Sequence, residues 1–222
     1  MKRVILAAPC VKRYDLLQKL FESAERGTRK PDRYFAVDNG GGLCTKQASK
    51  EICLPKNTTV VHMGRHIGVA GTWNLALGEH PDAWVVISND DVELHAATIE
   101  SLVQAAEDHF EAGFIYPAFN PGAMFCVFIV KHRVVAQIGG FDEQFYPAYF
   151  EDTDFHHRMK KAGIVEFAAP NASYDHVGSA TMKSFNEREM KTHHEQFKAN
   201  RNRYIAKWGS VPGLEAYDVP KT

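Results

Sequence analysis

Two carboxylates stand side by side directly after an apolar run in this sequence. Asp90 and Asp91, preceded by Asn89, follow the apolar residues 84–87. Adjacent carboxylates repel one another unless a cation or a hydrogen-bond donor offsets their charge. In proteins, Mg²⁺ and Mn²⁺ bind a few carboxylate oxygens together with substrate phosphates. The segment therefore favours a divalent-metal site at the end of a strand, and the alternative is a polar turn before a helix.

A second acidic group consists of Glu151, Asp152 and Asp154, at the expected start of a helix. Acidic side chains in the first helical turn interact favourably with the helix dipole, which explains one or two of them. Aromatic side chains precede the group at Phe145, Tyr146, Tyr149 and Phe150. Apolar surroundings raise the pKa of a carboxyl group and exclude water, which suits a general base. We expect Arg158 to pair with Asp154 or Glu151 at helical spacing.

One histidine is a candidate for completing a metal site that the carboxylates begin. His176 follows the apolar residues 164–168 after a short loop. Neutral imidazole binds the same divalent ions as carboxylates do. A lone histidine is more often structural or exposed to solvent, so both interpretations stay open at this point.

Alternating strands and helices must position these groups. Apolar runs predict strands at residues 4–8, 34–37, 58–62, 84–87, 125–130 and 164–168. Helical spacing predicts helices at 16–24, 69–77, 96–110 and 151–162, and a long one that begins at Ser184 or Asn186 and stops at Gly209. The alternation in the first half implies right-handed crossovers and a parallel sheet. Ligands bind beyond the carboxyl ends of such strands. The site is therefore expected near residues 9–13, 38–42, 63–68 and 89–91.

Length and composition exclude several classes of protein. The chain has 222 residues, 26 of them basic and 27 acidic. This balance excludes a strongly basic nucleic-acid clamp and an acidic disordered tail. The longest apolar runs have about eight residues, whereas a membrane span needs about 20. The four cysteines form no CxxC pair, which favours reduced thiols and a cytoplasmic location.

Residues 183–207 carry seven Lys or Arg side chains, beginning with Lys183, against three Glu. Such a segment is usually the solvated face of a helix. It could also attract a phosphorylated donor or a polyanionic acceptor.

Several motifs resemble those of GT-A fold glycosyltransferases of the broad family 2 type. The segment 138–163 is similar to the family's "GGFDE … ED-D-R … G" signature, and residues 89–91 resemble its DxD motif. Shorter similarities lie at residues 37–40, at Gly68, Gly71 and Asn74, and at 202–209. The resemblance implies an α/β, Rossmann-like single domain with a mostly parallel central sheet flanked by helices. Residues 1–115 would form its nucleotide-binding half, and residues 116–222 its acceptor-binding half with a C-terminal helix.

The resemblance also implies roles for individual residues. Asp91 would bind Mn²⁺ or Mg²⁺ at the donor diphosphate, and His176 would complete that site. Asp152 would be the catalytic base, with Glu151 as its rival. Contacts to the nucleotide sugar are implied for Pro9, Val11, Arg13, Asp38, Arg65, Gly68, Asn74, Asn89 and Asp90. Two departures from the family pattern are Asn89 in the first DxD position and His66 in place of an Asn.

The implied reaction is metal-dependent, inverting transfer of a sugar, as by a hexosyltransferase. The donor would be a nucleotide sugar, with a UDP-sugar as the first expectation, and the acceptor a hydroxyl of a glycan, a small molecule or another substrate. A nucleotidyltransferase of similar fold is an alternative, although residues 7–13 lack the glycine that its phosphate loop usually contains. A non-catalytic nucleotide- or glycan-binding module is another. The enzymatic interpretation requires both acidic groups to line one cleft.

Overall fold

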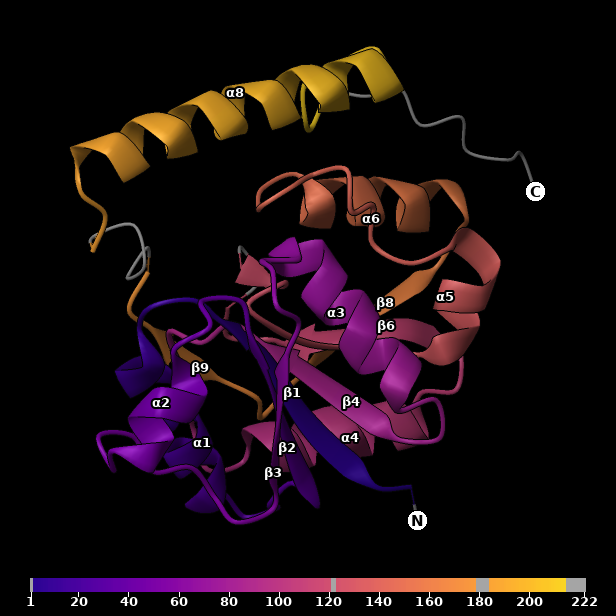
Figure 1. The fold of residues 1–222 in the computed structure, drawn as a ribbon. Helices are drawn as coiled ribbons and strands as arrows, with labels where there is room; N and C mark the ends of the chain where they lie inside the picture. The colour runs from indigo at the N-terminus through magenta and orange to yellow at the C-terminus, as the bar shows by residue number, and fades with distance from the viewer. Residues whose placement is uncertain (1, 121–122, 179–183, 215–222) are drawn as a thin grey trace.

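A seven-stranded sheet with the strand order β3-β2-β1-β4-β7-β6-β8 forms the centre of the protein (Figure 1). The computed structural model describes residues 2–120, 123–178 and 184–214. The strands of this sheet are β1 (Val4–Cys10), β2 (Arg33–Asp38), β3 (Thr58–His62), β4 (Trp84–Ser88), β6 (Ala112–Pro117), β7 (Val127–Val130) and β8 (Val165–Ala169). Neighbouring strands are parallel except for β7, which runs antiparallel to β4 and β6. The expected mostly parallel sheet is confirmed.

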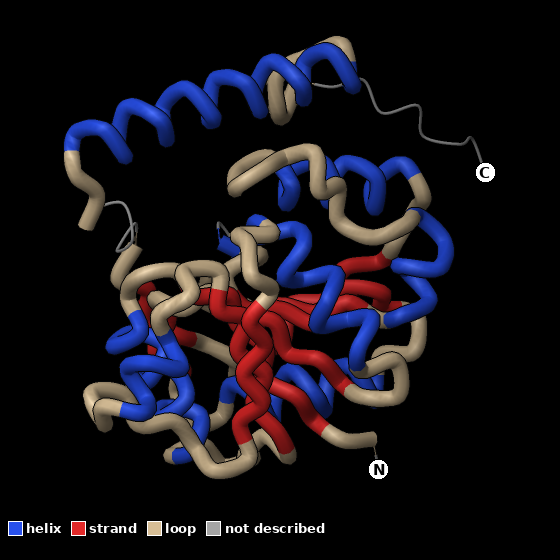
Figure 2. Tube along the Cα trace, viewed as in Figure 1, coloured by secondary structure: helices blue, strands red, loops and turns tan. Residues whose placement is uncertain are grey.

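Helices cover both faces of the sheet (Figure 2). They are α1 (Tyr14–Glu25), α2 (Leu43–Ala48), α3 (Gly68–Glu79), α4 (Thr98–Asp108), α5 (His132–Ile138), α6 (Glu151–Lys161) and α8 (Glu187–Trp208). Apolar side chains of α1, α2 and α4 pack in one core cluster, and those of α3, α5 and α6 pack in the other. Strand β1 contributes to both because successive side chains point to opposite faces: Leu6 lies in the first cluster and Ile5 in the second.

A small second sheet pairs β5 (Val92–Leu94) with β9 (Tyr174–His176) in antiparallel orientation. Neither strand was expected from the sequence. His176, which was expected to follow a short loop after residues 164–168, is the last residue of β9. Elements β6, α2 and α5 were not expected either. The helix expected at 96–110 is shorter, because α4 ends at Asp108 and leaves Phe110 83% exposed.

The C-terminal helix α8 crosses above the body of the protein on the side of α6 (Figure 1). Asn186, rather than Ser184, is its N-cap: the Asn186 side chain accepts from the Glu189 backbone, and the Glu189 side chain accepts from the Asn186 backbone. Gly209 ends the helix with a positive φ of 74°, as expected. Lys183 of the basic segment lies outside the described residues. Within the described ranges, no helix has the length and apolar character needed to cross a bilayer.

The carboxylate of Asp154, which is fully buried, joins α8 to α6. It accepts hydrogen bonds from Arg158 Nε at 2.9 Å and Trp208 Nε1 at 2.9 Å, and Lys207 Nζ lies 2.7 Å away. Arg158 also donates to the three carbonyls of the 138–140 turn. The expected pairing of Arg158 therefore involves Asp154, and this part of the acidic motif holds the fold together.

Candidate active site

Asp90 and Asp91 of the first acidic group and Glu151 and Asp152 of the second line a single cavity of about 530 Å³ beyond the carboxyl ends of β1 and β4. The cavity brings together eight of the residues expected to act at the site: Pro9, Val11, Asn89, Asp90, Asp91, Glu151, Asp152 and His176. Chain order explains the first group, because Asn89 directly follows β4. The second group lies at the first turn of α6, which the Asp154 contacts hold against α8. The spatial requirement of the enzymatic interpretation is thus met.

The pairing of β5 with β9 brings His176 next to Asp91. Val92 lies opposite His176 in the two strands, and the Val177 backbone N–H donates to the Asp91 carbonyl. His176 Nε2 consequently lies 3.0 Å from Asp91 Oδ1. The hydrogen bond to Asp91, together with a weaker one to Cys126, raises the pKa of His176 to about 10. The imidazole of His176 and the carboxylate of Asp91 are therefore hydrogen-bonded to each other, and both residues line the cavity.

Asp90 has an environment that disfavours its charged form. Burial, followed by the neighbouring carboxylate of Asp91, raises the pKa of Asp90 to about 7. A compensating cation nearby would favour ionisation of both carboxyl groups.

The donor atoms of Asp91 and His176 fit a divalent cation. A carboxylate oxygen and an imidazole nitrogen are suitable ligands for Mn²⁺ or Mg²⁺, and such ions commonly complete their coordination with water and substrate phosphates. Among the described residues, no group of three or more His, Cys, Asp or Glu side chains gathers around one point. Water and substrate phosphates would supply the rest of the coordination of a cation held by this pair.

Glu151 and Asp152 follow a turn of unusual backbone conformation. Tyr149 and Phe150 both have φ of 75°, a left-handed conformation that is uncommon for residues other than glycine. Glu151 is 5% exposed, and its Oε2 has no hydrogen-bond partner among the described residues. Burial, and then the charge of Asp152, raise the pKa of Glu151 well above its usual value. Asp152 is half-buried, with Oδ1 accepting from the backbone and side chain of Thr153.

Helix α8 holds this turn in place. The side-chain amide of Asn200, which is 1% exposed, approaches the carbonyls of Ala148 at 2.9 Å, Tyr146 at 3.2 Å and Tyr149 at 3.4 Å. Strained backbone persists where surrounding contacts determine it, often at functional sites. Asn200 therefore positions the start of α6 and the two carboxyl groups on it.

Asp38 lies at the end of β2 but is 1% exposed and does not line the cavity. Its carboxylate accepts hydrogen bonds from the Tyr14 hydroxyl at 2.9 Å, Gly41 N at 2.8 Å and Leu43 N at 2.9 Å. These contacts organise the turn after β2. The next residue, Asn39, lines the cavity instead. A contact of Asp38 to the nucleotide stays a prediction.

Four further residues expected to contact the nucleotide sugar also lie outside the cavity lining: Arg13, Arg65, Gly68 and Asn74. Arg13 pairs with Asp15 at 2.6 Å, and Arg65 is exposed. The Asn74 amide exchanges hydrogen bonds with the Phe141 backbone at 2.8 and 2.9 Å, which fixes the 140–143 turn against α3. Their roles toward a donor stay predictions.

The cavity also contains residues that the motifs did not indicate, among them Asn39, Trp73, Phe125, Cys126, Tyr149, Phe185 and His193. Tyr149 belongs to the aromatic run before Glu151, so a signal for it was present in the sequence. His193 comes from the inner side of α8. No flanking ligand or motif marks it, and only the tertiary arrangement brings it to the cavity.

Residues 6–161 match the model of the family described as Glycosyl transferase family 2. The chain belongs to this family. The matched range extends from β1 to the end of α6 and includes both acidic groups. The expected activity class is thereby confirmed: the protein is a glycosyltransferase.

Individual relatives agree with this assignment. An N-acetylglucosaminyl-diphospho-decaprenol L-rhamnosyltransferase of Mycobacterium tuberculosis is 24% identical, over 72% of this chain and 71% of that one. Among solved structures, the mannosyltransferase PcManGT from Pyrobaculum calidifontis in complex with GDP-Man and Mn²⁺ superposes with a TM-score of 0.59 at 14% identity, over 95% of this chain and 77% of that one. S. aureus TarS 1-349 gives a TM-score of 0.60 at 13% identity, over 94% and 74%. These structures share the GT-A fold with this glycosyltransferase.

Proposed function

We propose that this glycosyltransferase transfers a sugar from a nucleotide-sugar donor to an acceptor hydroxyl, with a divalent metal ion and with inversion at the anomeric carbon. The observation that carries the proposal is the single cavity shared by the Asp91–His176 pair and the Glu151–Asp152 pair. The structural neighbours named as complexes hold GDP-Man with Mn²⁺ in one case and UDP in another, which supports a nucleotide sugar as donor. We propose a UDP-sugar as the first candidate.

The donor side would be formed by residues at the carboxyl ends of β1, β2 and β4 and by His176 of β9. Asp91 and His176 would hold Mn²⁺ or Mg²⁺, and Pro9, Val11 and Asn39 would face the nucleoside. A bound divalent ion supplies positive charge that offsets the negative charge developing on the diphosphate leaving group. Because His176 is protonated when it pairs with Asp91 alone, it would have to release that proton to ligate the ion.

The acceptor side would be formed by the start of α6. As an acceptor hydroxyl attacks the anomeric carbon, Asp152 would take its proton, while the sugar passes through an oxocarbenium-like state. Asp152 suits this role better than Glu151, because Asp152 is half-buried in the cavity wall, whereas burial raises the pKa of Glu151 and so disfavours its charged, proton-accepting form. A general base contributes about 10²–10⁴-fold. Attack opposite the leaving group in a single displacement inverts the anomeric centre.

Replacement of the proposed base tests the function directly. We expect Asp152→Asn to lower transfer by about 10²–10⁴-fold, since an amide accepts no proton. Binding of the nucleotide sugar, measured by thermal stabilisation in the presence of Mn²⁺, should persist. Asp175→Asn is the matched control, because this β9 carboxylate has a side chain 80% exposed. Wild-type turnover by Asp152→Asn would refute the assignment.

The products and the metal requirement separate the proposal from its alternatives. Release of a nucleoside diphosphate supports glycosyl transfer, whereas release of pyrophosphate would indicate a nucleotidyltransferase. Nuclear magnetic resonance of the product reports the anomeric configuration. Metal-stripped protein should regain activity on addition of Mn²⁺ or Mg²⁺, and Asp91→Asn should require a higher ion concentration. Full activity in chelator would contradict the proposed metal site.

A further inference from the structure

Aromatic side chains from α8, from the residue before its N-cap and from the turn before α6 pack together and reach the cavity. The His193 ring packs edge to face against Tyr149, with 5.2 Å between ring centroids, and against Phe185 at 5.8 Å. Phe197, one helical turn further, lies 5.4 Å from Tyr149. His193, Tyr149 and Phe185 all line the cavity. Aromatic surface from α8 and from the turn before α6 thus covers the space near the catalytic carboxyl groups.

Two features of this surface are chemically informative. Burial, followed by the neighbouring His194, lowers the pKa of His193, which favours the neutral form of its ring. Next to this apolar surface, the buried Oε2 of Glu151 lacks a hydrogen-bond partner within the part of the chain that the structure describes. Buried polar atoms in folded proteins nearly always have a partner, and leaving one unpaired costs free energy. A polar group of a bound ligand would satisfy this atom.

We propose that Tyr149, His193 and Glu151 form the acceptor subsite and select a neutral sugar ring that carries two neighbouring hydroxyls. This inference rests on the proposed function, because it assigns the acceptor to the side of the cavity where Asp152 takes the proton. Tyr149 and His193 cover the C–H face of the ring. Glu151 binds one hydroxyl while the adjacent residue, Asp152, receives the proton of the next hydroxyl, the one that attacks.

The chemistry of the three side chains favours a sugar over other acceptors. A ligand site that combines aromatic walls with a few placed polar groups fits a molecule with an apolar face and a polar edge. A simple apolar alcohol would leave Glu151 Oε2 unpaired. An anionic acceptor would place its charge beside the carboxylate of Asp152, which repels it. A polyhydroxylated ring without charge meets all three conditions.

Acceptor kinetics test the inference, with methyl hexopyranosides as probes and the donor fixed at saturation. We expect His193→Ala and Glu151→Ala each to raise the acceptor KM about tenfold, with a smaller effect on kcat at saturating acceptor. Glu151→Gln should restore much of the affinity because its amide keeps hydrogen-bonding atoms at the same place. His193→Phe, which keeps an aromatic ring, covers the case in which His193→Ala fails to fold. Removal of the hydroxyl next to the attacking one should raise KM in the wild type but have little further effect in Glu151→Ala.

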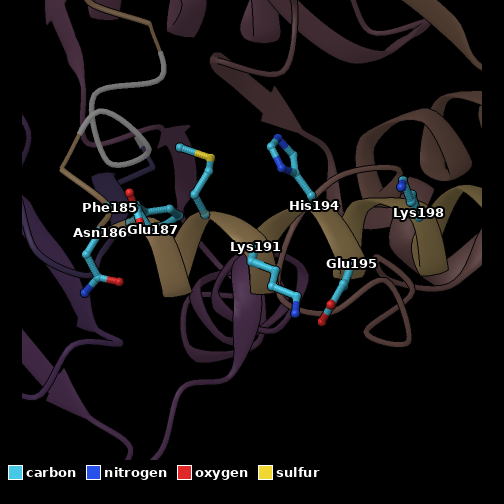
Figure 3. A pocket seen from close by; sticks show the side chains of 8 residues that line it. Phe185, Asn186, Glu187, Lys191, His194, Glu195 and Lys198 are labelled. Carbon is cyan, nitrogen blue, oxygen red and sulfur yellow. The ribbon is translucent and has the colours of Figure 1, made fainter.

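His194→Ala is the matched control. His194 is exposed on the same helix. Together with Lys191 and Lys198, it lines a second pocket on the surface of α8 (Figure 3). It should keep the wild-type acceptor KM. If transfer proceeds and neither His193→Ala nor Glu151→Ala changes the acceptor KM, or if simple alcohols serve as well as the glycosides, the inference is wrong while the proposed function stands. If the wild type turns over no nucleotide sugar, the proposed function fails and the inference falls with it.

Discussion

Replacing Asn200 by alanine should lower the stability of the fold and change the geometry of the acceptor side of the cavity. The Asn200 side chain is 1% exposed, and its amide nitrogen approaches three backbone carbonyls at 2.9, 3.2 and 3.4 Å. An amide has two hydrogens, so it makes at most two strong bonds here. Each contributes about 1 kcal/mol net, and carbonyls left buried without a donor cost about 1–3 kcal/mol more. We expect Asn200→Ala to lower the free energy of unfolding by roughly 3–5 kcal/mol.

The same substitution should lower catalysis, because Asn200 holds the turn at Tyr149 and Phe150. A non-glycine residue in the left-handed region costs on the order of 1–3 kcal/mol and stays there only while its surroundings require it. Without the amide, the turn can relax and move Asp152 away from its position in the cavity. In the folded variant, transfer activity should therefore fall further than donor affinity does.

Urea unfolding and acceptor kinetics measure the two effects. Asn202→Ala is the control, because Asn202 is exposed on the same helix. Asn200→Asp should be at least as destabilising as Asn200→Ala, since an ionised carboxylate cannot donate to a carbonyl. A loss below about 1 kcal/mol for Asn200→Ala, or a loss equal to that of the control, would refute the positioning role.

Four further substitutions test the framework around the site. Asp154→Ala removes the buried acceptor of three donor groups and should cost about 3–5 kcal/mol in urea unfolding; a cost under about 1 kcal/mol would contradict the network. Gly40→Ala would place a Cβ 1.7 Å from the Val11 carbonyl oxygen, so it should cost roughly 1–3 kcal/mol or more and weaken donor binding. Gly78→Ala, which adds a carbon in α3 with no described atom within 4 Å, should instead stabilise the protein by about 0.5–1 kcal/mol. A stabilising Gly40→Ala or a destabilising Gly78→Ala would contradict this reasoning. Lys12→Gln breaks an exposed ion pair to α8 and should leave the urea midpoint unchanged, which a clear shift would contradict.

The central strands were predictable because each is a continuous apolar run buried on both faces of a parallel sheet. Strand β3 matches its expected range of 58–62, and β1 differs only in its end. Strand β6 escaped notice because Gly113 and Pro117 interrupt its apolar run. The structure explains that glycine: a Cβ there would lie 2.5 Å from the Val134 side chain and 2.6 Å from that of Ile164. Close packing of α5 and the segment before β8, rather than flexibility, requires it.

The carboxyl groups of the site were predictable because their types and their places at element ends reveal their chemistry. Asp38 is an exception to this reasoning. Its carboxylate also lies at a strand end, but it accepts hydrogen bonds from the backbone of the turn that follows. The contact between Asp91 and His176 depends on the pairing of β5 with β9, two three-residue strands that lie about 80 residues apart. Such short strands carry no periodic signal, so no local pattern could reveal them.

The residues proposed to do the chemistry and the residues that shape the acceptor side come from different parts of the chain, and α8 supplies two of the latter. All the carboxyl groups that line the cavity lie within residues 6–161, the range that matches the family. Asn200, which holds the turn before α6, and His193, which covers the cavity beside Tyr149, both come from α8, beyond that range. Substitutions on the inner side of α8 can thus alter the acceptor surface without changing a carboxyl group. In a set of chimaeras that exchange α8 between glycosyltransferases of this fold, acceptor preference should follow the helix and donor preference should follow residues 6–161. Donor preference that moved with α8 would contradict this division.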